Sequence, residues 1–137
     1  MFYGCTVLTG VTIPDGVNSI GYSAFCGCTG LTSIAIPERV TAIGDEAFKN
    51  CTGITDVVVP DSVTEIGYRA FEGCSALTSI TLPFVGATKD GSKNTHFGYI
   101  FGAFHYGGNP TCVPSDLQTL IITGGTSIAD CAFYYCT

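Results

Sequence analysis

The sequence predicts a β-rich solenoid, in which stacked repeats form a parallel inner sheet of short strands with turns on the outer side. Three observations support this prediction. Cysteines recur 23 residues apart at Cys5, Cys28, Cys51 and Cys74, and the residues between them repeat in step. Each repeat opens with alternating apolar positions, which is typical of a strand. A proline follows each of the first four strands. A unit this short cannot bury its own apolar face, so neighbouring units must stack.

The composition fits one folded domain and argues against several classes of partner. The chain has 137 residues, of which 46% are hydrophobic and 12% charged, with a net charge of −6. This apolar content predicts a single domain over 1–137. The five basic residues form no cluster, so we expect no nucleic-acid partner. The apolar runs are far shorter than the ~18 residues of a membrane span, so we expect no membrane insertion.

Each repeat begins with the pattern L-x-x-I-x-I-P, except that the last one has Thr123 in place of the proline. Full repeats run over 8–30, 31–53 and 54–76, a fourth begins at Leu77, and the last begins at Leu117. The apolar positions of this pattern point inward, and the side chains between them pave the outward face of the inner sheet. These outward positions are Thr9, Gly10, Thr12, Thr32, Ser33, Ala35, Thr55, Asp56, Val58, Thr78, Ser79, Thr81, Gln118, Thr119 and Ile121. Because proline has no N–H to donate, the proline column ends the sheet along one edge.

A second short apolar segment and a turn complete each repeat. Val17, Ile20 and Gly21 of the first repeat recur 23 and 46 residues later. The repeat then ends in A-F-x-G-C, with Gly27, Asn50 or Gly73 before the cysteine. Glycine and asparagine tolerate a positive φ, so we expect this column to reverse the chain into the next strand.

These motifs resemble the BspA-like, or Treponema-type, family of bacterial leucine-rich repeats. The resemblance covers 1–82 and 117–137 and includes L-x-x-I-x-I-P, I-G-x-x-A-F and the final cysteine. It implies a leucine-rich-repeat solenoid of about five units of 22–23 residues. It also implies a non-enzymatic interaction or adhesion module of a bacterial surface or secreted protein, with a protein or glycan as ligand.

The fourth repeat contains an irregular insertion. Leu77 and Leu117 are 40 residues apart (117 − 77), which places the extra residues within 84–116. Residues 97–101 match a compressed I-G-x-x-A-F half, so we expect them to pack on the solenoid, with excursions near 86–96 and 102–116.

The insertion is also the best candidate for a binding site, because it is rich in aromatic residues and such loops are favoured in recognition. The alternative is that the rings only anchor the insertion to the solenoid. The partner-binding candidates are His96, Tyr99, His105 and Tyr106, with Thr78, Ser79 and Thr81 on the adjacent strand.

No motif predicts catalysis, a cofactor or a metal site. His96, His105 and Cys112 follow the order H-x8-H-x6-C, which matches no familiar protease or zinc pattern. The cysteines of the repeat column, Cys5, Cys28, Cys51, Cys74 and Cys136, are expected to be small buried hydrophobes with weak S–H donors. Cys26 and Cys131 lie off the column and are expected at the surface, whereas Cys112 can pair or stay free.

Both ends of the chain fall inside a repeat. Residues 2–5 form the tail of one repeat, and Thr137 directly follows a terminal cysteine. We therefore expect a segment of a longer array, whose uncapped end repeats can self-associate. The alternative function is a structural spacer array with no ligand of its own, and buried aromatics in the insertion would favour it.

Overall fold

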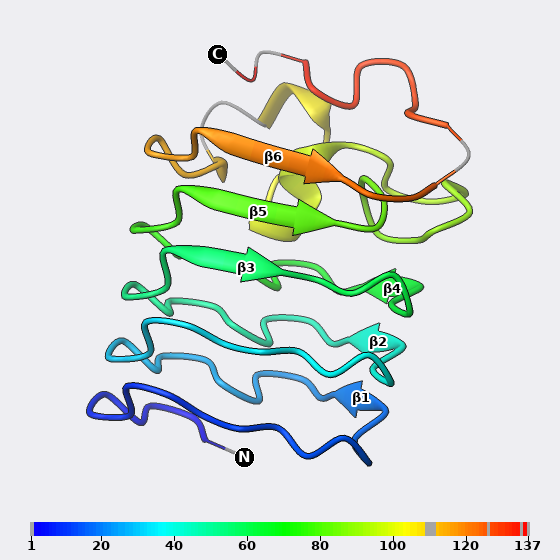
Figure 1. Cartoon of the computed structure of the whole chain (residues 1–137). Helices are drawn as coiled ribbons and strands as arrows, with labels where there is room; N and C mark the ends of the chain where they lie inside the picture. Colours follow the sequence, from blue (N-terminus) through cyan, green and yellow to red (C-terminus); the bar gives the residue numbers. More distant parts are fainter. Residues whose placement is uncertain (1, 109–111, 126, 135, 137) are drawn as a thin grey trace.

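The chain forms a stack of repeats with the N-terminus at one end and the C-terminus at the other (Figure 1). The computed structural model describes residues 2–108, 112–125, 127–134 and 136. Its elements are β1 (Ser19–Ile20), β2 (Ala42–Ile43), β3 (Asp56–Val58), β4 (Glu65–Ile66), β5 (Ser79–Leu82), the 3-10 helices η1 (Phe97–Phe101) and η2 (Tyr106–Gly108), and β6 (Thr119–Ile122). The predicted β-rich leucine-rich-repeat solenoid is confirmed.

Two parallel sheets cover two sides of the stack. The front sheet has the order β3-β5-β6 and contains the L-x-x-I-x-I strands. Single parallel bridges from Thr12 to Ala35 and from Ala35 to Val58 extend it toward the N-terminus. The side sheet has the order β1-β2-β4, in which Ile20 pairs with Ile43 and Ile43 with Ile66. The second apolar segment of each of the three full repeats therefore forms a short strand as well.

The third side of the stack, here called the turn side, contains the A-F turns. On this side each repeat donates to the next one: the Phe25 N–H donates to the Ala47 carbonyl and the Phe48 N–H to the Ala70 carbonyl, both at 2.8 Å. Gly27, Asn50 and Gly73 have φ of 75°, 58° and 72°, as predicted for the residues that reverse the chain.

A second column on the turn side also adopts the left-handed conformation. Ser23, Glu46 and Arg69 have φ of 49°, 57° and 60°. The sequence gives no sign of this conformation, because none of the three residue types favours it.

The core is a set of columns that run the length of the stack. The inward strand residues of the middle repeats are fully buried, as Ile54, Val57 and Leu77 illustrate. The rings of Phe2, Phe25, Phe48 and Phe71 stack on one another with 5.4 Å between successive centroids. This ladder shows that each repeat contributes one layer to a continuous core.

The insertion is largely integrated into the solenoid. The Arg69 and Phe71 N–H groups donate to the carbonyls of Tyr99 and Ile100, so η1 replaces the A-F turn of the fourth repeat. This is the packing that we expect of a compressed half-repeat. The expected excursion at 86–96 is partly wrong, because Thr88 pairs with Glu65 of β4 in an antiparallel bridge. The segment therefore folds back along the side sheet, and residues 84–87 are buried.

The last repeat returns to the register of the front sheet. Ser79 of β5 pairs with Thr119 of β6, and the pairing continues to the end of both strands. On the turn side the Phe97 N–H donates to the Ala132 carbonyl, and the Phe133 ring lies 5.4 Å from that of Phe97. The solenoid therefore resumes after the insertion.

Candidate functional site

The outward face of the front sheet, here called the front face, is exposed and almost uncharged. One of its rows contains Thr12, Ala35, Val58, Thr81 and Ile121, which the strand pairing places side by side. Val58 and Ile121 are about half exposed, at 53% and 50%. Among the outward positions of this sheet, Asp56 is the only residue with a charge. The face therefore offers a surface of low charge, in which Ala35, Val58 and Ile121 of this row are apolar.

Two threonine hydroxyls of the front face donate hydrogen bonds within the fold. The Thr78 hydroxyl donates to the Thr55 carbonyl at 3.0 Å, and the Thr32 hydroxyl donates to the Thr9 carbonyl at 3.2 Å. Thr78 is exposed, whereas Ser79 and Thr81 are half-buried. A partner that covers these hydroxyls loses little free energy of binding to desolvation, because the hydroxyls keep their hydrogen-bond acceptors within the fold.

His96, the first candidate of the insertion, lies in the interior. It is 8% exposed, and its Nε2 lies 2.9 Å from the Ala103 carbonyl oxygen. A carbonyl oxygen only accepts, so Nε2 carries the hydrogen and donates it. The ring also meets Tyr99 edge-on, with 6.0 Å between centroids. His96 therefore closes the loop that follows η1 instead of facing a partner.

An aromatic cluster anchors the insertion to the third repeat. Tyr68 lies 5.3 Å from both Tyr99 and Phe104, and its hydroxyl donates to the Gly102 carbonyl at 2.7 Å. Burial raises the pKa of the half-buried Tyr99. Phe97 and Phe101 are buried as well. Most described rings of the insertion therefore pack against the solenoid.

Phe104 is the exception, because 78% of it is exposed. It follows the buried Ala103, on a turn fixed by the bond between Ala103 and His96. His105 is exposed next to it, and its Nδ1 accepts the Gly107 N–H at 3.1 Å. Tyr106 begins η2, and its side chain lies outside the described part of the structure. The aromatic density of the segment pointed to this region, but nothing in the sequence distinguishes Phe104 from its buried neighbours.

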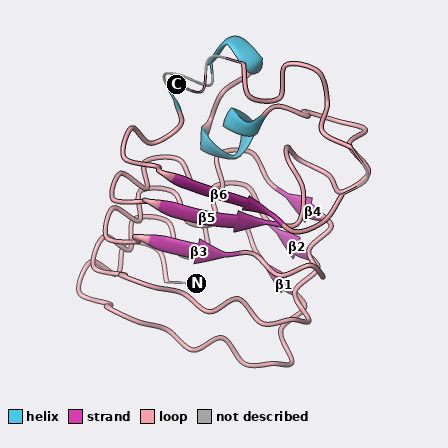
Figure 2. Cartoon of the chain, turned by 45° about the horizontal axis from the view of Figure 1, so that its top comes forward, coloured by secondary structure: helices cyan, strands magenta, loops and turns pink. Residues whose placement is uncertain are grey.

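The candidate residues lie on two separate surfaces. His96 and Tyr99 contact each other beside Phe104, on the part of the insertion that packs on the turn side. Thr78, Ser79 and Thr81 belong to the front sheet, and both 3-10 helices lie behind that sheet (Figure 2). The two groups thus cannot form one continuous site.

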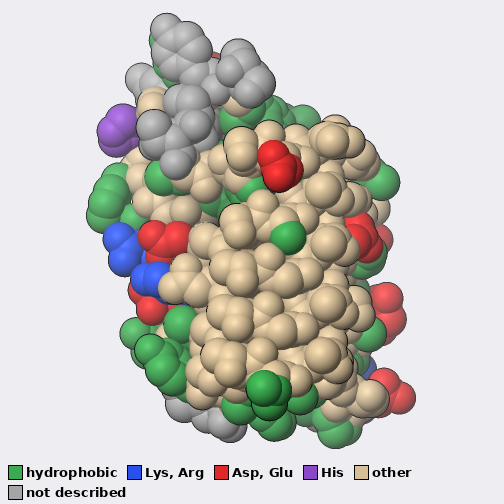
Figure 3. All heavy atoms as spheres, turned by 90° about the vertical axis from the view of Figure 1, so that its left-hand side faces the viewer, with side chains coloured by type: hydrophobic (Ala, Val, Ile, Leu, Met, Phe, Trp, Pro, Cys, Tyr) green, Lys and Arg blue, Asp and Glu red, His purple; other side chains and the backbone are tan. Residues whose placement is uncertain are grey.

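A cluster of charges on the turn side joins the second and third repeats. Lys49 lies 3.1 Å from Glu46 and 2.9 Å from Glu72, and Arg69 lies 3.7 Å from the same two carboxylates. Hydrogen bonds to Glu72 and Glu46 raise the pKa of Lys49. Figure 3 shows basic and acidic side chains gathered at one edge of the molecule, beside a broad face of polar and backbone atoms. The charges are mutually compensated, so the cluster aligns the two repeats and leaves no uncompensated charge to attract a ligand.

The column cysteines of the middle repeats are buried donors, as predicted. The Sγ atoms of Cys28, Cys51 and Cys74 donate to backbone carbonyls of the preceding repeat at 3.0, 3.1 and 3.2 Å. Burial raises the pKa of Cys51 to about 12. Cys5 is half-buried and Cys136 is exposed, so the expectation that the column cysteines are buried is wrong for Cys136. Because burial raises their pKa, the Cys28, Cys51 and Cys74 thiols stay protonated at neutral pH and are poor nucleophiles.

The expectation that Cys26 lies at the surface is wrong. Cys26 is buried close to the charged cluster of Glu46, Lys49 and Glu72, and burial raises its pKa. Cys131 is exposed, as expected, and Cys112 is half-buried.

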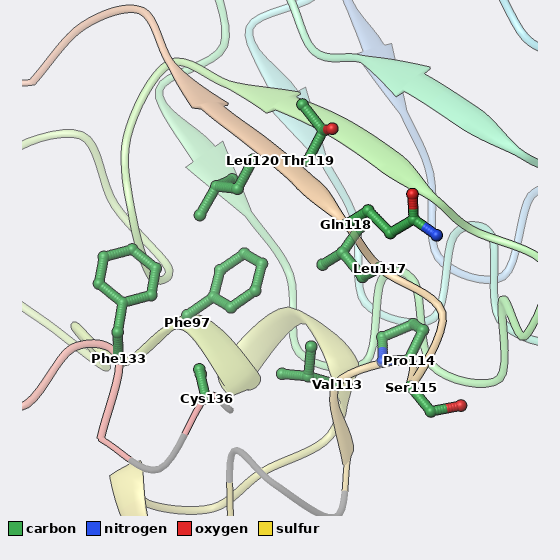
Figure 4. Close-up of a pocket in the computed structure, with 10 residues that line it drawn as sticks. All are labelled: Phe97, Val113, Pro114, Ser115, Leu117, Gln118, Thr119, Leu120, Phe133 and Cys136. Carbon is green, nitrogen blue, oxygen red and sulfur yellow. The ribbon is translucent and has the colours of Figure 1, made fainter.

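A hollow of about 310 Å³ opens at the C-terminal end of the stack. Figure 4 shows Leu120 pointing from β6 toward the rings of Phe97 and Phe133, with Val113 and Pro114 on the far side. Most of the side chains that line it are apolar. In the described part of the chain no cluster of His, Cys, Asp and Glu could hold a metal. The helices described there are also too short or too polar to cross a bilayer.

Stacked parallel strands of 23-residue units, a phenylalanine ladder and buried columns of Leu, Ile and Cys define a leucine-rich-repeat solenoid. A family model described as a BspA type leucine rich repeat region (6 copies) matches residues 1–91. The chain therefore belongs to the BspA-type leucine-rich repeat family, as its motifs predicted.

Solved structures of bacterial proteins resemble the chain. A leucine rich cell surface protein from Faecalibacterium prausnitzii is 42% identical, with a TM-score of 0.56 over 58% of this chain and 21% of its own. A leucine-rich repeat protein from Bacteroides ovatus is 34% identical, with a TM-score of 0.51 over 60% of this chain and 27% of its own. The T. pallidum leucine rich repeat protein is 28% identical, with a TM-score of 0.66 over 90% of this chain and 60% of its own. The chain thus spans about a fifth to three fifths of these structures, and comparison with curated proteins gave no match.

Proposed function

We propose that this chain is a protein-interaction module of a bacterial surface or secreted protein, and that it binds its partner through the front face. The exposed row from Thr12 to Ile121 is the observation that carries the proposal. Solenoids commonly use such extended sheets for binding. The name of the Faecalibacterium protein supports the surface location.

The chemistry of the front face suits a neutral partner surface. Val58 and Ile121 supply exposed apolar area on either side of Thr81. The Thr32 and Thr78 hydroxyls already donate within the fold, so a partner can cover these two hydroxyls without leaving either of them unsatisfied. Adhesion to an extracellular protein is the form of interaction that this surface fits best.

The insertion provides a second, smaller candidate surface. Phe104 stands exposed on a turn that internal hydrogen bonds hold in place, with His105 and Tyr106 following it. Exposed rigid aromatic side chains are frequent energetic centres of interfaces. We therefore include the turn at Phe104 as a second candidate binding surface, although most of the aromatic rings of the insertion are buried.

The experiment compares binding of labelled chain and variants to an array of extracellular-matrix proteins and glycans. Val58→Glu places a charge in the centre of the front face, Phe104→Ser removes the exposed ring, and Tyr22→Ser alters another exposed aromatic as the control. We expect Val58→Glu to weaken binding at least ten-fold, with the control unchanged. A loss confined to Phe104→Ser would move the site to the insertion. Absence of binding by the parent chain would favour the structural spacer.

A further inference from the structure

An exposed aromatic ring and a carboxylate lie close together where the side sheet meets the turn side. Phe104 packs on Tyr68 with 5.3 Å between the ring centroids, and Tyr68 packs on Tyr99 at the same distance. The Tyr68 N–H donates to the Asp45 carboxylate at 2.8 Å. Asp45 follows β2 along the chain and is exposed, as is Glu65 at the start of β4. These five residues are here called the acidic–aromatic patch.

The patch carries negative charge that is not taken up by ion pairs. Burial raises the pKa of Tyr99, and the nearby charges of Asp45 and Glu65 raise it further. In the described part of the chain, neither carboxylate belongs to an ion pair. Lys89, which follows the residue that pairs with Glu65, donates instead to the Asp61 carbonyl at 2.9 Å. A cation that approaches the patch therefore meets two carboxylates that attract it.

The rings of the patch already contact one guanidinium group of the chain itself. The Arg69 Cζ atom lies 5.0 Å from the centroid of the Tyr68 ring, which is a cation–π contact. Arg69 also lies 3.7 Å from both Glu46 and Glu72, so its charge is shared with the charged cluster. Phe104 contacts Tyr68 but remains 78% exposed. Its ring is therefore open to a second cation, supplied from outside the chain.

The turn that presents Phe104 is held in place by hydrogen bonds on the N-terminal side of the ring. The Tyr68 hydroxyl donates to the Gly102 carbonyl at 2.7 Å. The next carbonyl, that of Ala103, accepts a hydrogen bond from His96 at 2.9 Å. A ring that is fixed before a partner arrives loses little conformational entropy when the partner binds.

We propose that the acidic–aromatic patch binds an arginine side chain on an exposed segment of a partner protein. The guanidinium group stacks on the Phe104 ring, and the carboxylates of Asp45 and Glu65 attract its charge. This inference rests on the proposed function and names the chemistry that its second surface recognises. A neutral glycan could also stack on the ring, but it would make no use of the two charges.

The probe is a fluorescent peptide in which single arginines are separated by Gly-Ser pairs. The control peptide has citrulline at each arginine position, because citrulline keeps the shape of the side chain without its charge. Binding is measured by fluorescence anisotropy at low ionic strength. We expect the arginine peptide to bind about five-fold more tightly than the citrulline peptide. In about 1 M salt the difference should shrink, because the Debye length falls to about 3 Å.

Three substitutions test whether the patch is the site. Phe104→Ser and Asp45→Asn should each weaken binding of the arginine peptide by about two- to five-fold, and Glu65→Gln should act in the same direction. Asparagine keeps an oxygen that can accept the Tyr68 N–H, so Asp45→Asn removes the charge and preserves the turn. Asp56→Asn is the matched control, because it removes one charge from the front face and should leave the affinity unchanged. Circular dichroism verifies that every variant is folded.

Equal binding of the arginine and citrulline peptides would overturn the proposal, and a loss with Phe104→Ser in that case would indicate a neutral ligand. Equal losses with Asp45→Asn and Asp56→Asn would also overturn it, because they would show attraction by the net charge of the chain. The front face is tested independently by Val58→Glu on the matrix array. A failure of the arginine site is therefore distinguishable from a failure of the proposed function.

Discussion

The phenylalanine ladder allows a direct test of how repeats stabilise one another. Phe48 is fully buried between Phe25 and Phe71, with 5.4 Å to each ring centroid, whereas Phe25 and Phe71 are separated by the Phe48 ring. If coupling in the solenoid passes only between adjacent layers, the pair of Phe48 and Phe71 must couple energetically and the pair of Phe25 and Phe71 must not. Leucine at these positions keeps the site apolar while removing the stacking.

The expected magnitudes follow from the geometry. A stacked aromatic pair contributes about 0.5–1.5 kcal/mol beyond its burial. Phe48→Leu removes two such pairs, so we expect it to lower the free energy of unfolding by about 1–3 kcal/mol. The double-mutant cycle of Phe48→Leu with Phe71→Leu should give a coupling energy of about 0.5–1.5 kcal/mol. The cycle of Phe25→Leu with Phe71→Leu should be additive within about 0.3–0.5 kcal/mol.

The assay is urea unfolding followed in parallel by far-ultraviolet circular dichroism and tyrosine fluorescence. Coincident transitions establish that a single free energy describes each variant. Equal coupling energies in the two cycles would refute the nearest-neighbour argument, because they would mean that layers that do not touch are coupled as strongly as adjacent layers. Additivity in the cycle of Phe48 and Phe71 would show that the stacked geometry contributes nothing beyond burial.

Three further predictions concern single positions. Gly86→Ala should lower the free energy of unfolding by more than about 2 kcal/mol, because Gly86 has φ 96° and a Cβ there would collide with the Asn94 carbonyl. Gly16→Ala is the control: a Cβ at Gly16 meets open space, so this substitution should change the free energy of unfolding by less than about 0.5 kcal/mol. The pKa of Cys51 is raised from 9.0 to about 12, so the contribution of its protonated thiol to stability is complete below pH 9 and falls as the pH rises toward 12. In urea unfolding, the difference in the free energy of unfolding between the parent and Cys51→Ser should therefore shrink over that pH range. A constant difference would contradict the raised pKa of Cys51. Lys49→Met should lower the free energy of unfolding by about 0.2–1 kcal/mol at low ionic strength and by less in 1 M salt, and a salt-independent loss would indicate packing in place of charge.

The sequence was sufficient to predict the repeated part of the fold, because each column has a physical reason visible in the residue types. The alternation of Val57 and Val59 with exposed side chains predicts the strand, and Gly27 predicts the positive φ at the turn. The prediction failed where a position depends on neighbours from another repeat. Cys26 is buried and lies close to charged side chains of the second and third repeats, and no pattern within its own repeat shows this.

The candidate site was less predictable for the same reason. His96 and Phe104 both lie in an aromatic, glycine-rich segment without a repeat pattern, yet one is buried and the other exposed. What separates them is the local path of the chain after η1, where Gly102 adopts φ 102° and Ala103 turns its carbonyl toward His96. Composition identifies such a segment as a candidate for recognition, but it does not specify which ring faces solvent.

The insertion shows which features a solenoid must keep when a repeat changes length. Leu77 and Leu117 are 40 residues apart instead of 23, yet Ser79 still pairs with Thr119 in parallel register. The two requirements that are met are local: Ile100 offers the carbonyl that the Phe71 N–H needs, and buried rings from η1 fill the layer. Once both are satisfied, the residues beyond η1 are released from the repeat pattern. Beyond the contacts of Tyr68 with Gly102 and Phe104, the turn is therefore free of the repeat pattern, which is the freedom that a recognition loop requires.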